Sequence, residues 1–196
     1  MRIRTLLTVA STLALGLGTA MALPGTPQRD CVVDVTGGAE KCFTDYRAAI
    51  AFATDGAITD APHDAHGAVG EPAFRAEVAR LAFRNRPGSV RVGRSAGLLV
   101  AEGNPVIGAT LFTGTNYTGQ SETLRIAAPC VKNGKYDYGF RLGTVGRHAK
   151  SAQPWANCWI WLHSGDSWSS PRQGPYTTDT PDLGDWKDRA VLMGLS

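Results

Sequence analysis

The sequence predicts a mainly β protein in which a small α+β region precedes a C-terminal antiparallel sandwich of two repeats. Residues 44–56 have helical periodicity, whereas from Val106 onward short β-rich runs are separated by Gly, Asn, Asp, Ser and Pro. Residues 112–119 and 163–170 share one spacing of ring-bearing side chains. Such internal similarity is typical of two supersecondary units that bury a face against each other.

The first 22 residues have the composition of a secretory signal peptide. Two arginines precede an apolar run over residues 5–18, and residues 20–22 (Ala-Met-Ala) form a small-x-small cleavage signal. The apolar run is shorter than the roughly 20 residues that a membrane span needs. We therefore expect a secreted, extracellular protein without a membrane span. Residues 23–30, rich in Pro and Gly, are expected to form a flexible leader.

The charge balance argues against a nucleic acid partner. The chain has 20 Lys and Arg against 17 Asp and Glu, a formal charge of +3, and removal of the two signal-peptide arginines lowers it to +1. A protein that binds a long polyanion has a much larger positive excess. The arginines concentrated in residues 71–94 are interpreted as a solvated helix face. We expect a monomer.

The four cysteines fall into two groups, Cys31 with Cys42 and Cys130 with Cys158. An even number of cysteines in an exported chain indicates disulfides, although sequence alone does not choose among the three possible pairings. We favour Cys31–Cys42 and Cys130–Cys158, because each pair lies within one expected structural unit. The absence of a Cys-x-x-Cys motif argues against a zinc knuckle or a thioredoxin-like site.

Residues 31–56 are expected to form a hairpin followed by a helix. Valines after Cys31 favour a strand, and Gly37-Gly38 favours a turn. Thr44 is a suitable N-cap and Gly56 a suitable C-terminal cap. The helix between them has a regular apolar face made of Tyr46, Ala49, Ile50 and Ala53.

A second helix is expected to begin at Pro72, because proline fits the first helical position. Its buried stripe recurs at helical spacing and consists of Phe74, Val78, Leu81 and Ala82. We expect a loop over residues 61–70 before it and one or two strands within residues 90–100 after it. A domain boundary is expected at residues 102–105, which divides an α+β region (31–101) from the sandwich (106–196).

The first repeat (about 106–153) begins with Phe112, Tyr117 and Gly119 in the sequence LFTGTNYTG. In the second repeat (156–196), an ungapped alignment places His163, Trp168 and Ser170 at the same positions. The pattern Phe-x4-Tyr-x-Gly, followed by a β run, resembles the start of a βγ-crystallin Greek key. The resemblance implies that Phe112 and Tyr117 pack on a folded hairpin and that Gly119 takes a backbone conformation unfavourable for other residues.

The resemblance extends to a class of protease inhibitors. The block at residues 156–160 (ANCWI), with Cys130 upstream, is similar to secreted bacterial proteins grouped with the crystallin-like metalloprotease inhibitors, peptidase-inhibitor class I36. The resemblance covers residues 106–196 and does not extend to residues 23–100.

The family's calcium signature is degenerate in both repeats. In that family two acidic or amide residues and a serine supply oxygen, the donor that calcium prefers. Repeat one has Arg147, His148 and Ser151 at these positions, and repeat two has Lys187, Asp188 and Val191. Only Ser151 and Asp188 match, and cations or imidazoles are unsuitable ligands for calcium. We therefore expect no calcium site and no other cofactor.

Two other clusters are interpreted as structural. His63, Asp64 and His66 could hold a metal, but the Pro and Gly residues around them favour a polar loop. The tryptophans in the second half could form a sugar-binding platform, but they are expected to fill the sandwich core and the repeat interface instead.

The sequence has no HExxH or P-loop motif, and we expect no catalytic residues and no enzyme. The function we expect is that of a secreted, non-enzymatic crystallin-like protein. The resemblance alone implies inhibition of extracellular metalloproteases, and residues 130–138 are one candidate inhibitory loop. The alternatives are a structural or binding module of the cell envelope and, third, a hydrolase with an unrecognised site within residues 31–100.

Overall fold

The computed structural model describes residues 29–86 and 104–196. The expected signal peptide, most of the expected leader and the strands expected within residues 90–100 lie outside this part of the chain. The boundary of the leader needs one correction. Asp30, placed at its end by composition, is the first residue of a strand and is fully buried.

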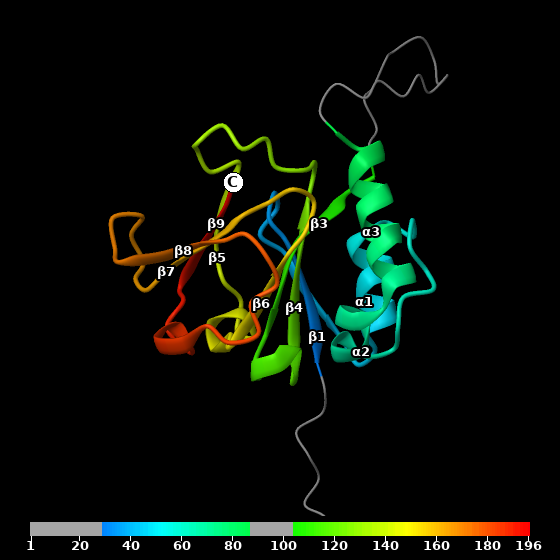
Figure 1. The fold of residues 1–196 in the computed structure, drawn as a ribbon, viewed down its shortest axis with the longest axis horizontal. Helices are drawn as coiled ribbons and strands as arrows, with labels where there is room; N and C mark the ends of the chain where they lie inside the picture. The colour runs from blue at the N-terminus through cyan, green and yellow to red at the C-terminus, as the bar shows by residue number, and fades with distance from the viewer. Residues whose placement is uncertain (1–28, 87–103) are drawn as a thin grey trace, which may run out of the picture.

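The described residues form two β-sheets and three α-helices (Figure 1). The first sheet has the order β2-β1-β4-β3-β6, with β1 Asp30–Asp34, β2 Glu40–Phe43, β3 Val106–Phe112, β4 Ser121–Ile126 and β6 Ser151–Pro154. The second has the order β5-β9-β7-β8, with β5 Tyr138–Arg141, β7 Ile160–His163, β8 Arg172–Tyr176 and β9 Leu192–Leu195. The helices are α1 Tyr46–Ala53, α2 Ala65–Gly70 and α3 Pro72–Arg84, with short 3-10 turns at Thr115–Tyr117, Gly146–His148 and Gly184–Trp186.

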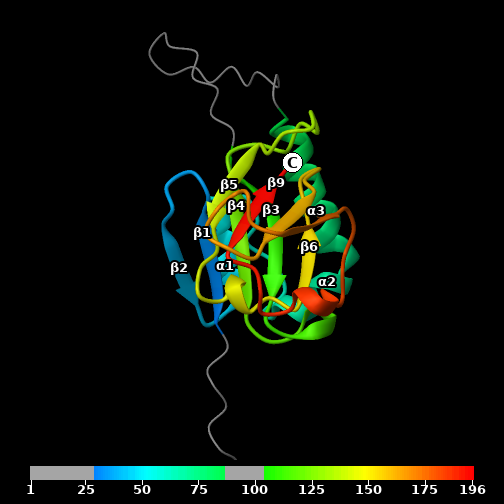
Figure 2. The same ribbon diagram turned by 90° about the vertical axis from the view of Figure 1, so that its left-hand side faces the viewer.

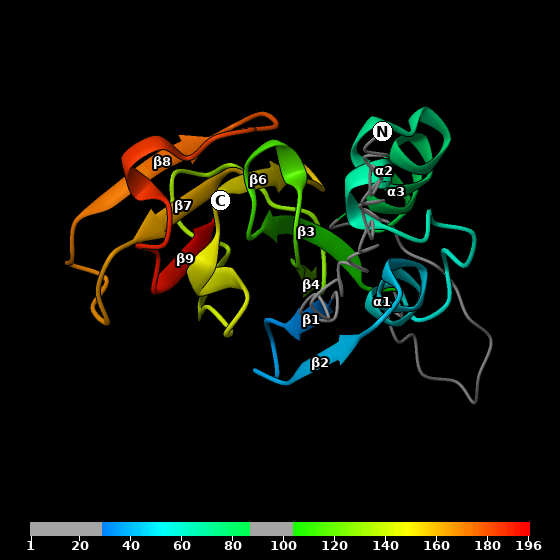
Figure 3. The same cartoon turned by 90° about the horizontal axis from the view of Figure 1, so that it is seen from below.

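These elements stack in three layers, with the helices against one face of the first sheet and the second sheet on its other side (Figure 3). This arrangement explains the composition of β3, whose residues VIGATLF do not alternate between apolar and polar. Every residue of β3 is buried, because both faces of the first sheet are covered.

The two repeats exchange segments between the sheets. Strand β5 belongs to repeat one but pairs with β9 of repeat two in the second sheet. In the other direction, Thr180 of repeat two forms an isolated antiparallel bridge with Ala152 of β6 in the first sheet. The fold is therefore mainly β, a Greek-key sandwich with helices on its N-terminal side, as the sequence predicts.

The expected N-terminal region and the sandwich share one sheet. Strand β1 pairs in parallel with β4, so the N-terminal hairpin completes one edge of the sandwich's own sheet (Figure 2). Arg125 of β4 forms ion pairs with Asp34 and Asp55, which come from the hairpin and from the end of α1. Buried residues from the helices and from both sheets form one continuous core within the described residues. A compositional boundary at residues 102–105 thus does not divide the packing.

The first helix begins one residue later than expected. Asp45, rather than Thr44, is the N-cap, and its carboxylate accepts a hydrogen bond of 2.9 Å from the N–H of Arg47. At the other end Gly56 has a positive φ of 76° and donates to the carbonyl of Ala51, as a C-terminal cap should.

The segment expected to be a loop contains a short helix, α2. Asp64 caps it by accepting a hydrogen bond of 2.7 Å from the N–H of Gly67, and its residues Ala65 and Ala68 are buried. Alanine is only weakly hydrophobic, so the buried alanines of this segment do not form a recognisable apolar helical stripe in the sequence. Helix α3 begins at Pro72 as predicted, and its four expected stripe residues are all buried.

Candidate functional site

The folded hairpins of the two repeats have the same ring geometry. Phe112 and Tyr117 meet edge to face with ring centroids 5.5 Å apart, and His163 and Trp168 do so at 5.1 Å. In repeat one Gly119 has a φ of 80°, and a Cβ there would lie 2.5 Å from the hydroxyl of Thr113. The side chains named by the sequence pattern therefore build the hairpins.

The register of the second repeat differs by one residue from our alignment of the calcium signature. Phe112 pairs with Ser151, whereas His163 pairs with Leu192. Leu192, not Val191, is thus the structural equivalent of Ser151. In the observed register the buried alanines 149 and 190 become equivalent.

The side chains at the degenerate calcium positions have protein partners. Ser151 donates to the carbonyl of Gly114 at 2.7 Å and accepts from the N–H of Tyr117 at 3.0 Å. The imidazole of His148 lies 3.5 Å and the ammonium of Lys150 lies 3.7 Å from the carboxylate of Asp188. Arg147 donates to a backbone carbonyl, and Lys187 pairs with Asp182. Whether calcium binds stays a prediction.

The two histidines of the cluster His63, Asp64 and His66 contact different partners. His63 pairs with Asp45 at 3.1 Å, and His66 lies 3.0 Å from the carbonyl of Asn116. In the part of the chain that the structure describes, the one group with metal-like spacing is Cys31, Glu40 and Cys42. Its two sulfurs form a disulfide, so they are not available as ligands.

The segment at residues 130–138, here called the disulfide loop, is fixed at both ends. The Cys130–Cys158 disulfide and a hydrogen bond of 2.9 Å from Asn157 to the carbonyl of Cys130 hold its start. At its end the hydroxyl of Tyr138 donates to the carbonyl of Ala128 at 2.8 Å and accepts from its N–H at 3.0 Å. A hydrogen bond of 3.0 Å from the N–H of Val131 to the carboxylate of Asp137 crosses the base of the loop. Residues 131–135 between these anchors are exposed.

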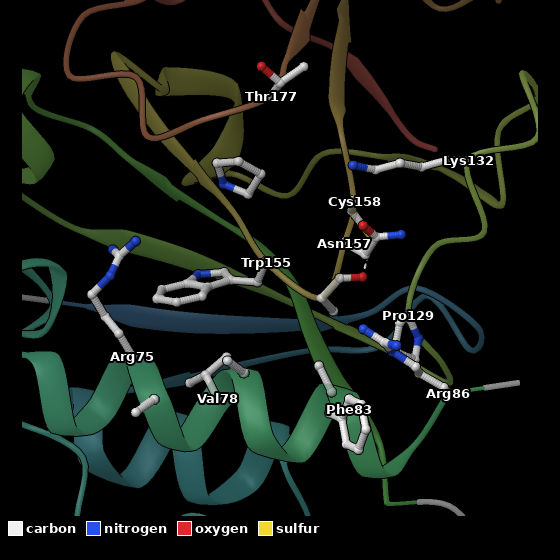
Figure 4. A pocket seen from close by; sticks show the side chains of 15 residues that line it. Arg75, Val78, Phe83, Arg86, Pro129, Lys132, Trp155, Asn157, Cys158 and Thr177 are labelled. Carbon is white, nitrogen blue, oxygen red and sulfur yellow. Dashed lines mark hydrogen bonds between the residues drawn. The ribbon is translucent and has the colours of Figure 1, made fainter. Parts of the chain in front are cut away.

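A groove of about 570 Å³, here called the helix groove, lies between α3 and residues 154–158, with Lys132 of the disulfide loop also lining it. Figure 4 shows the Trp155 ring and Arg75 side by side over α3, with Lys132 across the groove. The guanidinium of Arg75 lies 5.2 Å from the Trp155 ring, and Phe83 at one end is 63% exposed. The groove combines an apolar floor with cations at its margin.

A second cavity, here called the aromatic pocket, lies on the other side of the disulfide loop. It measures about 390 Å³, and Lys132 lines both cavities. Its other lining residues are Gly134, Lys135, Tyr136, Trp159, Trp161, Arg172 and Ser196.

The tryptophans are divided between the core and the surface. Trp155 is buried, but it packs edge to face on Phe74 of α3 at 6.1 Å, outside the sandwich interior. Trp168 is 46% exposed, and Trp161 lines the aromatic pocket. The expectation that these rings fill the core holds for Trp155, which belongs to the buried core, and in part for Trp186, which packs against it, but it fails for Trp168.

Sequence reasoning missed a buried acid, Glu122 of β4. Its carboxylate is fully buried and accepts hydrogen bonds from the N–H groups of Gly143 and Gly146. Burial raises the pKa of Glu122 to about 7, against the opposing effect of these hydrogen bonds and of Arg147. The sequence SETLRI does not indicate that Glu122 is buried, because a glutamate among polar residues of a strand is usually expected to face solvent.

Two searches of known proteins gave no match, and one gave structural neighbours. No family model and no curated protein matches the chain. None of the helices described is long and apolar enough to cross a membrane. The chain is similar to a βγ-crystallin domain from Clostridium beijerinckii, at 18% identity over 45% of this chain and 95% of that one, with a TM-score of 0.35. It is also similar to the N-terminal domain of protein S (13%; 45% and 94%; TM-score 0.36) and to Hahellin, a βγ-crystallin (17%; 46% and 91%; TM-score 0.34).

Proposed function

We propose that the protein is a secreted, non-enzymatic, crystallin-like monomer that inhibits an extracellular metalloprotease through the disulfide loop. The observation that supports this proposal is the loop's construction. Its exposed residues 131–135 stand on a base held by one disulfide, by hydrogen bonds that Asn157 and Tyr138 donate, and by one that Asp137 accepts.

A loop fixed in this way is suited to a protease cleft, because little conformational entropy remains to be lost on binding. Val131 is 56% exposed and could enter an apolar subsite, while the adjacent Lys132 and Lys135 carry positive charge. A flexible loop with the same residues would be a substrate rather than an inhibitor. The fixed base is therefore the feature that favours inhibition over cleavage.

The test is a titration of a thermolysin-like metalloprotease and a trypsin-like serine protease with the mature protein. We expect residual metalloprotease activity to fall linearly to an equivalence point. Val131→Asp should abolish inhibition, and Ala39→Asp, a change at an exposed residue between β1 and β2, serves as the matched control. Full activity of both proteases at a large molar excess would refute the proposal.

A second candidate is a binding module of the cell envelope, which the aromatic pocket favours because aromatic rings and cations gather there. Retention of the protein on cell-wall preparations, without any effect on proteases, would support this function instead.

A further inference from the structure

The aromatic pocket has the size and lining of a site for a small ligand. Its volume of about 390 Å³ lies within the usual range for such sites. Three aromatic side chains, Tyr136, Trp159 and Trp161, share it with three cations, which are Lys132, Lys135 and Arg172. No acidic side chain lines it among the described residues.

Two of the three cations, Arg172 and Lys132, lie over aromatic rings. The guanidinium of Arg172 lies 4.7 Å from the Trp161 ring, and the ammonium of Lys132 lies 4.5 Å from the Trp159 ring. Within residues 29–86 and 104–196, none of the three cations has a carboxylate at ion-pair distance. An anion bound in this pocket would therefore gain attraction without displacing an acidic partner.

Protein contacts hold two of the three rings in place, those of Tyr136 and Trp161. The hydroxyl of Tyr136 lies 3.0 Å from Nε2 of His163 and accepts a hydrogen bond of 3.0 Å from Arg172. Its ring lies against Gly194, where an added Cβ would come within 2.9 Å. Trp161 donates to the hydroxyl of Ser196 at 3.0 Å. Such a site loses little side-chain entropy on binding.

We propose that the aromatic pocket binds an anionic carbohydrate of the uronic-acid type. A sugar ring presents a flat face of C–H groups that packs on an aromatic side chain, and its carboxylate suits the adjacent cations. The chain has 20 basic and 17 acidic residues, and this small positive excess disfavours a long polyanion as ligand. The positive charge is concentrated in the pocket instead, which suits a short acidic ligand. This inference goes beyond protease inhibition and does not depend on it.

The experiment is a titration of the folded protein with trigalacturonic acid, followed by tryptophan fluorescence and calorimetry, with maltotriose as the uncharged control. We expect saturable binding of the acidic trisaccharide that weakens with added salt, and no binding of maltotriose. Arg172→Gln should weaken binding about tenfold or more, because it removes a charged hydrogen-bond donor from the pocket. Arg189→Gln is the matched control, since its guanidinium also lies over an indole, 5.5 Å from the Trp186 ring and outside the pocket.

If Arg172→Gln lowers the melting temperature, Lys135→Gln on the exposed loop provides the second test, and it should also weaken binding. Four results would overturn the proposal. The first two are the absence of a saturable signal with trigalacturonic acid, and binding of maltotriose as tight as that of trigalacturonic acid. The other two are a loss of affinity in Arg189→Gln as large as that in Arg172→Gln, and tighter binding of adenosine monophosphate than of trigalacturonic acid. A result with proteases of either kind would leave this inference unaffected.

Discussion

Glu122 accepts a hydrogen bond of 2.7 Å from the backbone N–H of Gly146. The contact joins β4 of the first sheet to the segment between β5 and β6, where a Cβ on Gly146 would come within 2.4 Å of the Glu122 carboxylate. The carboxyl group is therefore enclosed by backbone, and its ionisation is coupled to folding.

The first prediction concerns pH. The folded-state pKa of Glu122 is about 7, above its usual value of 4.5, so between these values the unfolded state is ionised while the folded state keeps the proton. The contribution of Glu122 to stability is present in full below pH 4.5 and is lost as pH rises towards 7. At about 1.4 kcal/mol per pH unit the loss amounts to about 3 kcal/mol.

Urea unfolding from pH 4 to 8 measures this effect. Glu122→Gln should flatten the fall in unfolding free energy between pH 4.5 and 7. The control is Glu77→Gln, which removes only a surface pair with Arg80 and should leave the pH profile unchanged. An unaltered slope in Glu122→Gln would contradict the assignment.

The second prediction concerns the turn at Gly119. Gly119→Ala should lower the unfolding free energy by about 1 to 3 kcal/mol, because φ is positive there and the new Cβ meets Thr113. Gly37→Ala is the matched control, since its φ is not in the positive range and its Cβ would meet nothing within 4 Å. Thermal unfolding by circular dichroism compares the two, and equal melting temperatures would show that the turn relaxes freely.

The third prediction separates the two disulfides. By loop-closure entropy, replacing both cysteines by serine should cost about 3 kcal/mol for Cys31–Cys42, which spans 11 residues, and about 4 kcal/mol for Cys130–Cys158, which spans 28. Only the second replacement should also weaken protease inhibition, because it releases the start of the disulfide loop. Equal loss of inhibition in both variants, measured well below their melting temperatures, would mean that the loop's anchoring is not what matters.

The fourth prediction concerns calcium. His148 and Lys150 already approach the carboxylate of Asp188, so calcium would have to compete with an imidazole and an ammonium group for it. We expect calorimetric titration with calcium chloride to show no site tighter than about 100 μM, and the melting temperature to stay the same with EDTA or calcium. Two tight sites would overturn this expectation.

Local patterns identified the features that depend on neighbouring residues. The stripe of α3 from Phe74 to Ala82 follows from helical periodicity, and the conformation of Gly119 follows from the turn around it. The aromatic spacing of the hairpins is local in the same way.

Features that depend on distant pairing were not predictable. The burial of Glu122 requires Cys31 beside it in the parallel ladder and Leu111 on its other side, a register set by strands far apart in sequence. The same long-range pairing turns the N-terminal hairpin into part of the sandwich. The aromatic pocket likewise combines the disulfide loop with β7, β8 and the chain's last described residue.

The parallel pairing of β1 with β4 also has a consequence for solubility. Without the N-terminal hairpin, β4 would be the outermost strand of its sheet, with a free row of backbone N–H and C=O groups from Ser121 to Ile126. Such an edge is a template for strands of other molecules. The hairpin occupies that edge and presents instead β2, a short strand with charged Glu40 and Lys41. It therefore protects the sandwich from aggregation as well as extending it.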